Sequence, residues 1–150
     1  MRENVKKLQN EIKELATKFF QAVYEIDGLL SNANEILIHF EKLDWDELKS
    51  ELPNWNNDEL QILASTISNG DDNGNILDDD FFYGYVFTLV DDSTSRFLLQ
   101  NMFNFLDNVI SENLLKSMIL KLSSMNKNGY LEQEEYEYWI NRIENNVASR

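Results

Sequence analysis

The sequence predicts an all-α fold of seven to eight helices. Apolar residues recur at spacings of three and four through most of the 150 residues, which is the period of one helical face. No stretch alternates apolar and polar residues as a half-buried strand would, and one proline and five glycines leave little turn chemistry for a sheet. Short connections favour consecutive antiparallel hairpins, arranged as a bundle or as a short α-solenoid.

A long first helix is predicted over residues 1–27, because its apolar side chains share one face and Gly28 follows as a stop signal. That face carries Val5, Leu8, Ile12, Leu15, Phe19, Ala22 and Ile26. The stretch spans about three heptads, so self-association as a coiled coil is an alternative to packing on the rest of the chain. Phe20 and Val23 widen the stripe beyond a narrow seam, which favours packing.

A helical core is predicted over residues 30–125. Its first helix has one apolar stripe, made of Ile36, Leu37, Phe40 and Leu43. Asp44 with Glu47 has the spacing of a capping box that opens the next helix, and Pro53 should end that helix because proline lacks the N–H that a helix interior needs.

Two further helices follow in this core. Asn57 or Asp58 is predicted to cap one that ends at Gly70, and Asp78 to cap the next. The buried faces should contain Leu60, Leu63 and Ile67 in the former, and Phe81, Phe82, Tyr85, Val86 and Leu89 in the latter. Tyr83 is out of phase with that second set, so we expect it to be the most exposed aromatic residue there.

The last three predicted helices complete one domain over residues 1–150, a length that can bury a substantial core. Ser93 should cap the first of them, a turn is expected at 126–129, and the final helix should run over 131–147. Their apolar faces carry Phe97, Leu98, Phe105, Leu106 and Ile110, then Leu114, Leu115, Met118, Ile119 and Leu122, and finally Tyr136, Trp139, Ile140 and Ile143.

Composition excludes several classes of function. The chain has 27 acidic and 13 basic residues, and a net charge of -14 repels nucleic acids and anionic membranes as direct partners. It has no cysteine for disulfides or thiolate sites, and its single histidine, His39, is expected to be a surface or hydrogen-bonded residue rather than a catalytic base. No apolar leader or membrane span is visible, so we expect a cytoplasmic protein. We expect it to be a monomer or a weak homodimer.

The negative charge is concentrated in the middle of the chain. Residues 51–100 contain ten acidic residues and one basic residue, and no lysine or arginine occurs between Lys49 and Arg96. Local effects explain part of this, since carboxylates are favoured at helix N-termini and in turns. Asp91 and Asp92 are harder to explain, because Asp91 is predicted in the last turn of a helix, where the dipole disfavours an anion.

We interpret this segment as an extended acidic surface that binds a protein, with a plain solvated surface as the alternative. Its acidic groups stand at opposite ends of one predicted helix, about 20 Å apart, which suits a protein partner better than a small cation. The predicted partner-binding residues are Asp71, Asp72, Asp78, Asp79, Asp80, Tyr83, Asp91 and Asp92.

Two segments partly match the twelve-residue EF-hand calcium loop, which supplies oxygen ligands at fixed positions. The first match has candidate ligands at Asn69, Asp71, Asn73 and Asp80, with Gly74 and Ile76 at the glycine and apolar positions. The second consists of Ser124, Asn126, Asn128, Gly129, Leu131 and Glu135. Asn-Gly turns that end helices explain most of both matches, so a calcium-binding module is only an alternative.

No catalytic motif stands out. The sequence lacks a phosphate-binding glycine loop, a nucleophile elbow and a helical pair of metal ligands, so we expect neither an enzyme nor a cofactor.

Part of the chain, roughly residues 35–125, resembles a known family. The segments LDWDELKSELPNWNNDELQILASTIS, DDDFFYGYVFTLVDD and RFLLQNMFNFLDNVI are similar to small all-helical immunity proteins of bacterial polymorphic toxin and contact-dependent growth inhibition systems, of the Imm30-type or HEAT-like group. The resemblance implies a cytoplasmic inhibitor that binds the C-terminal domain of a secreted toxin, usually a nuclease. An acidic adaptor and a mimic of DNA charge are the other interpretations of the acidic surface.

Overall fold

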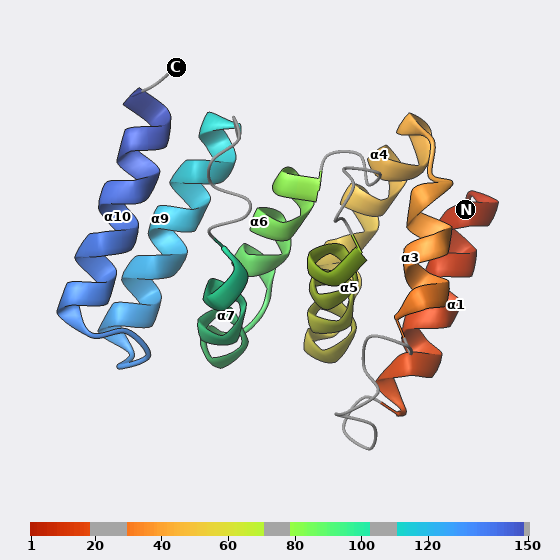
Figure 1. Cartoon of the computed structure of the whole chain (residues 1–150), viewed down its shortest axis with the longest axis horizontal. Helices are drawn as coiled ribbons and strands as arrows, with labels where there is room; N and C mark the ends of the chain where they lie inside the picture. The colour runs from red at the N-terminus through yellow and green to blue at the C-terminus, as the bar shows by residue number, and fades with distance from the viewer. Residues whose placement is uncertain (19–29, 71–78, 103–110, 149–150) are drawn as a thin grey trace. The chain divides into compact units, whose positions relative to one another are not determined.

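The computed structural model describes residues 1–18, 30–70, 79–102 and 111–148 (Figure 1). Within these ranges the chain forms α-helices, two short 3-10 helices and turns, with no strand, so the predicted all-α class is confirmed. None of the described helices is long and apolar enough to cross a bilayer. The chain divides into two compact units, Met1–Asp79 and Asp80–Arg150, while the single-domain organisation stays a prediction.

The first unit is built from α1 (Glu3–Ala16), α3 (Ser31–Ile38), α4 (Lys42–Glu51), the 3-10 helix η2 (Leu52–Asn54) and α5 (Asn57–Gly70). Helix α1 packs against α3, α4 and α5, and α3 also packs against α5. Each helix contributes its apolar face to the core, which includes Val5, Leu8, Ile12, Leu15, Leu37, Trp45, Leu48, Leu52, Leu60, Leu63 and Ile67. The described part of the first predicted stripe and the stripe of α5 are buried. The single helix predicted to carry Ile36, Leu37, Phe40 and Leu43 is wrong, because α3 ends at Ile38 and Leu43 lies in α4, where it is 60% exposed.

Helix α1 is shorter than the predicted helix over 1–27. It ends at Ala16, where the N–H groups of Thr17 and Lys18 donate to the carbonyls of Glu14 and Leu15 respectively. The Thr17 hydroxyl also donates to Glu14 O at 2.7 Å. These bonds replace the i→i−4 pattern and close the helix. Residues 19–29, which hold the later part of the predicted stripe, lie outside the described residues.

Helix α4 begins earlier than the sequence suggests. Its N-cap is Glu41, and Asp44 occupies the third helical position, where its Oδ2 accepts the Glu41 N–H at 2.9 Å. The capping box predicted for Asp44 and Glu47 is therefore wrong, because the observed one lies three residues earlier, at Glu41 and Asp44. Pro53 lies in η2, directly after the helix ends.

Asp44 also joins α4 to the start of α1. Its carboxylate is 1% exposed and accepts bonds from Arg2 Nε at 2.5 Å and Asn4 Nδ2 at 2.9 Å. Burial by itself would raise the pKa of Asp44, but the bonds from Glu41 N–H, Asn4 and Arg2 together outweigh it and hold that pKa below its ordinary value.

Helix α5 is capped one residue before the predicted positions. Asn56 Oδ1 accepts the Glu59 N–H at 2.8 Å, and Glu59 Oε1 accepts the Asn56 N–H at 2.9 Å. This reciprocal capping box begins the helix at Asn57, so the prediction of Asn57 or Asp58 as the cap is wrong. The helix ends at Gly70, as predicted.

The second unit contains α6 (Asp79–Leu89), α7 (Asp92–Leu98), the 3-10 helix η3 (Leu99–Asn101), α9 (Glu112–Lys127) and α10 (Gln133–Ala148). Helix α9 packs against α7 and α10 (Figure 1). Its core includes Phe82, Val86, Phe87, Leu98, Leu99, Met102, Leu114, Leu115, Met118, Leu122, Met125, Leu131, Trp139 and Ile143. Phe97 was predicted to be buried and is 46% exposed, and residues 103–110, with Phe105, Leu106 and Ile110, lie outside the described residues.

Helix α6 is buried more deeply than its sequence period predicts. A Cβ at Gly84 would lie 3.1 Å from Leu114 Cδ2 and 3.3 Å from Met118 Sδ, so α6 approaches α9 closely at this glycine. On α7, the carbonyl of Leu98 accepts the Tyr83 hydroxyl at 2.6 Å. Tyr83 is 1% exposed and burial raises its pKa, so the expectation of an exposed tyrosine is wrong. Because α6 contacts both α9 and α7, its buried surface is wider than one helical stripe.

A Schellman turn joins α9 and α10 close to the predicted turn at 126–129. The Gly129 N–H donates to Asn126 O, and the Tyr130 N–H donates to Met125 O at 2.8 Å. Gly129 adopts φ +84°, a left-handed conformation that glycine tolerates best. The turn reverses the chain, so α9 and α10 form an antiparallel hairpin.

Candidate functional site

Asp91 has a local structural role. Helix α6 ends at Leu89, and Asp91 is the N-cap of α7, where its Oδ1 accepts the Thr94 N–H at 2.8 Å. The predictions that Asp91 belongs to the preceding helix and that Ser93 caps the next one are therefore both wrong. The carboxylate stands at the positive end of a helix dipole, which accounts for its presence without a partner protein.

Asp92 is neutralised by a base from a distant part of the sequence. Lys121 Nζ lies 3.0 Å from Asp92 Oδ1. The lysine side chain is only 13% exposed and the aspartate side chain 14%. Asn128 Nδ2 and Ser124 Oγ donate to Asp92 Oδ2 at 2.9 and 3.1 Å, and Lys121 also donates to the Val90 carbonyl. The Asn128 bond above all, with those from Lys121 and Ser124, holds the pKa of Asp92 below its ordinary value despite burial.

The side chains of the second calcium-loop match are engaged elsewhere. Ser124 and Asn128 donate to Asp92, Asn126 Nδ2 donates to Leu131 O at 3.2 Å, and Glu135 pairs with Arg96. The Lys121 ammonium already supplies a positive charge beside Asp92. Within the described part of the chain, no group of three or more histidine or carboxylate side chains is arranged to hold a metal ion.

The predicted acidic surface is only partly described. Asp71, Asp72 and Asp78 lie outside the described residues, as do the side chains of Asp79 and of Asn69 and Asn73 in the first calcium-loop match. Asp80 is half-buried in the first turn of α6. With Tyr83 buried and Asp91 and Asp92 used within the unit, the described residues of this set do not form one exposed binding surface.

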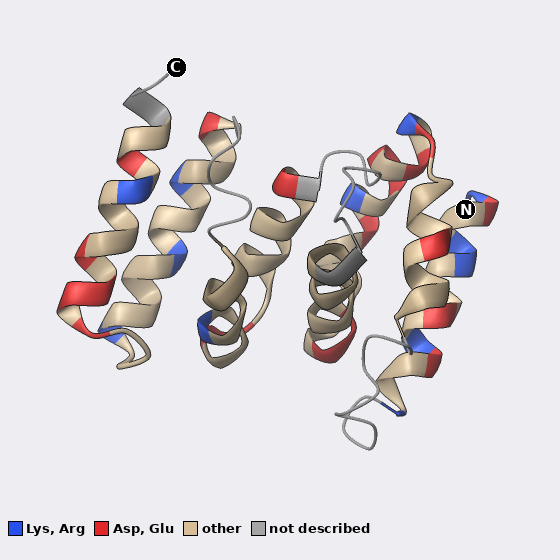
Figure 2. Ribbon diagram, viewed as in Figure 1, with Lys and Arg blue, Asp and Glu red and all other residues tan. Residues whose placement is uncertain are grey.

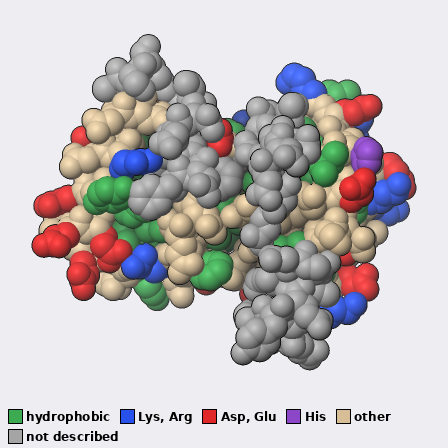
Figure 3. All heavy atoms as spheres, viewed as in Figure 1, with side chains coloured by type: hydrophobic (Ala, Val, Ile, Leu, Met, Phe, Trp, Pro, Cys, Tyr) green, Lys and Arg blue, Asp and Glu red, His purple; other side chains and the backbone are tan. Residues whose placement is uncertain are grey.

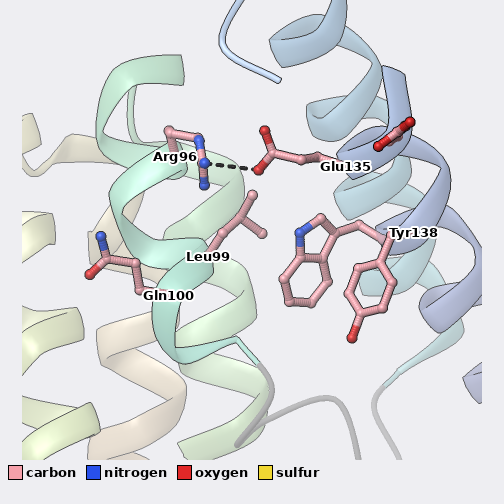
Figure 4. Close-up of a pocket in the computed structure, with 7 residues that line it drawn as sticks. Arg96, Leu99, Gln100, Glu135 and Tyr138 are labelled. Carbon is pink, nitrogen blue, oxygen red and sulfur yellow. Dashed lines mark ion pairs between the residues drawn. The ribbon is translucent and has the colours of Figure 1, made fainter. Parts of the chain in front are cut away.

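A groove between two elements of the second unit is a better candidate. One wall comes from α7 and η3, with Arg96, Leu99 and Gln100, and the other comes from α10, with Glu135 and Tyr138 facing them (Figure 4). Glu134 and Trp139 complete the lining of a space of about 410 Å³. We call this the α7–α10 groove. Its size lies toward the lower end of the range of about 300–1,000 Å³ that is typical of ligand sites.

The groove has an apolar floor and a charged edge. Leu99 and Trp139 are 3% and 6% exposed, whereas Tyr138 is 43% exposed and meets the Trp139 ring edge-to-face, with centroids 5.2 Å apart. Arg96 Nη2 binds Glu135 Oε2 at 2.8 Å across the space (Figure 4). Such a site can anchor one long side chain, with the ring for stacking and the carboxylates for polar contact.

Exposed carboxylates gather around the start of α10, and one of them, Glu134, lines the groove. Glu132, Glu134 and Glu137 are exposed, and none of the three forms an ion pair with another described residue. Figure 2 shows acidic residues gathered at the N-terminal end of α10, and Figure 3 shows their side chains exposed on the same face. We call Glu132, Glu134 and Glu137 the α10 acidic cluster.

Sequence reasoning missed both the groove and this cluster. The signal was present in LEQEEYEYW, where four glutamates and three aromatic residues occur together over 131–139. Elsewhere, His39 is exposed as predicted, with its Nε2 3.2 Å from Glu35 Oε1.

No protein-family model, curated protein or solved structure matches the chain.

Proposed function

We propose that this chain is a binding protein that neutralises a positively charged protein domain by covering it. In its specific form, the proposal is a cytoplasmic immunity protein for a secreted toxin domain of the nuclease type. The observation that carries it is the α7–α10 groove, in which an exposed tyrosine and an apolar floor adjoin the α10 acidic cluster.

The chemistry of this surface suits such a partner. A nuclease must hold phosphate groups, so its active-site surface is usually basic. An acidic surface accelerates encounter with a basic one and disfavours acidic competitors, while buried aromatic contacts supply most of the affinity. The net charge of -14 also attracts a positively charged partner at long range.

The corrected placement of the aspartates narrows the proposed surface. Asp91, Asp92 and Tyr83 stabilise the second unit from within, so their replacement would test folding as much as binding. The α10 acidic cluster is exposed, which makes its charges replaceable without removing a described ion pair.

Growth protection tests the proposal directly. The full chain is co-expressed with the C-terminal toxin domains encoded beside its gene, and growth is compared with that of cells expressing each toxin domain alone. We expect the wild type to restore growth with one of these toxin domains. The variant E132K/E134K/E137K should protect less well, because its affinity for that toxin domain should be at least ten-fold lower. The control E3K/E14K/D46K makes the same change of net charge on exposed residues of the first unit.

Two results would contradict the proposal. Absence of protection and of binding with every such toxin domain would remove the immunity function. Equal protection by the wild type and E132K/E134K/E137K would show that the α10 acidic cluster is not the binding surface.

A further inference from the structure

We infer that the α7–α10 groove receives an arginine side chain of the basic partner, stacked on Tyr138 and paired with the carboxylates of Glu134 and Glu135. This inference rests on the proposed function for the existence of a basic partner and adds the chemical group that the groove recognises. Three features of the groove support it: its lining, the charge at its edge and the ion pair that Arg96 already forms there.

The lining suits a side chain with a long apolar stem and a charged tip. Leu99 and Trp139 form a buried floor, and Tyr138 offers a half-exposed ring beside it. Arginine covers apolar surface with its methylene groups and keeps its guanidinium at the polar edge. The planar guanidinium also stacks on aromatic rings, a contact that lysine cannot reproduce in the same geometry.

The charge at the edge selects a cation. Glu134 and Glu135 both line the groove, whereas Arg96 is its only basic lining residue among those the structure describes. Glu132, directly before this helix, and Glu137, in its second turn, are also exposed. A purely apolar occupant would cover the Glu134 carboxylate without giving it a partner, which costs free energy.

Arg96 shows that a guanidinium fits against this wall. Its Nη2 lies 2.8 Å from Glu135 Oε2, with 44% of the arginine side chain and 36% of the glutamate side chain exposed. An incoming arginine can share Glu135, use the free carboxylate of Glu134, and occupy the space over Tyr138. Arg96 then competes with the guest for the same carboxylate, so its removal should tighten binding of a cationic guest.

Peptide titration of the isotope-labelled full chain, followed by amide chemical shifts in NMR, tests this inference. The probe is a capped glycine–serine peptide with one central arginine. Three matched peptides carry citrulline, lysine or leucine at that position. Citrulline keeps the planar shape without the charge, lysine keeps the charge without the plane, and leucine keeps only an apolar stem.

We expect the arginine peptide to bind with a dissociation constant on the order of millimolar, as suits one anchored side chain. Shifts should map to α7, η3 and α10, and the other three peptides should bind at least about five-fold more weakly. E134Q/E135Q should weaken the arginine peptide about five-fold, and Arg96→Met should tighten it a few-fold, as exposed ion pairs contribute modestly. The control E144Q, on the same helix but outside the groove lining, should leave binding unchanged.

Equal binding of the citrulline, lysine or leucine peptide would overturn the inference, as would shifts confined to other elements or weaker binding in Arg96→Met. Unchanged amide spectra of the free variants establish that they fold. Because the titration uses no toxin, its failure is separate from failure of the growth assay: protection without arginine binding would leave the proposed function standing and remove only this inference.

Discussion

Loss of Lys121 should strongly destabilise the second unit, because it would leave the buried Asp92 carboxylate without its cation, and Lys121→Met tests this. Methionine keeps most of the apolar stem of lysine and removes the ammonium group. The substitution leaves the Asp92 carboxylate, 14% exposed, without a cation and takes a donor from the Val90 carbonyl.

The expected loss follows from the remaining contacts. Removing one partner of a buried pair costs about 3–5 kcal/mol. Asp92 keeps its bonds from Ser124 and Asn128, so we expect about 2–3 kcal/mol in the free energy of unfolding near neutral pH. The loss should shrink at low pH, because protonation of Asp92 breaks the pair in the wild type as well.

Urea unfolding monitored by circular dichroism measures this loss, and Lys116→Met is the matched control. It makes the same substitution on the same helix, but Lys116 pairs with Glu112 at 3.7 Å with both side chains mostly exposed. Such i,i+4 pairs contribute about 0.3–0.5 kcal/mol. If Lys121→Met and Lys116→Met cost the same, the account of Asp92 as an internally neutralised residue is wrong.

Three further predictions concern stability and use the same urea measurement. Folding lowers the pKa values of Asp44 and Asp92, so the two ionised carboxylates should contribute their full stabilisation of the fold above about pH 4. That contribution should be lost as the pH falls through their pKa values in the folded state, and D44N/D92N should therefore show a smaller fall of the unfolding free energy with pH. Asn56→Ala should cost about 1 kcal/mol through loss of the α5 cap, and a cost near zero would contradict the capping box. Gly84→Val should cost about 1–3 kcal/mol because even a Cβ would crowd Leu114, whereas a neutral effect would show that α6 and α9 are less closely packed.

Helical periodicity predicted the fold class well because every described element is a helix with at least one buried face. It failed where a helix has more than one neighbour. Tyr83 is out of phase with the main stripe of α6, yet it is buried because α7 contributes a carbonyl acceptor on that side. Packing on a second face depends on tertiary arrangement, which a single-helix period does not contain.

Cap positions were predicted to within a few residues but not individually. Several adjacent residues of each connection can accept a backbone N–H, as in the run from Asn56 to Asp58 and the run from Asp91 to Ser93. The N-cap is the one residue among them that has an extended backbone directly before the first helical residue. Asp91, at φ −67° and ψ 165°, has the extended backbone of an N-cap.

The candidate site was the least predictable part. Counting charge along the chain identified a base-free segment, but Lys121 follows Asp92 by 29 positions and still neutralises it. Likewise the α7–α10 groove joins Leu99 to Tyr138, which are remote in sequence. Only the concentration of glutamate and aromatic residues after Leu131 indicated one wall of it.

The salt dependence of association with a toxin domain that the chain neutralises is the sharpest test of an acidic binding surface. Stopped-flow rates are measured for the full chain from roughly 0.02 M to 0.5 M sodium chloride, a range over which the screening length falls several-fold. A negative surface that meets a basic partner predicts an association rate that drops at least about ten-fold across this range, and a smaller drop in E132K/E134K/E137K. An association rate that is independent of salt in the wild type would contradict the account.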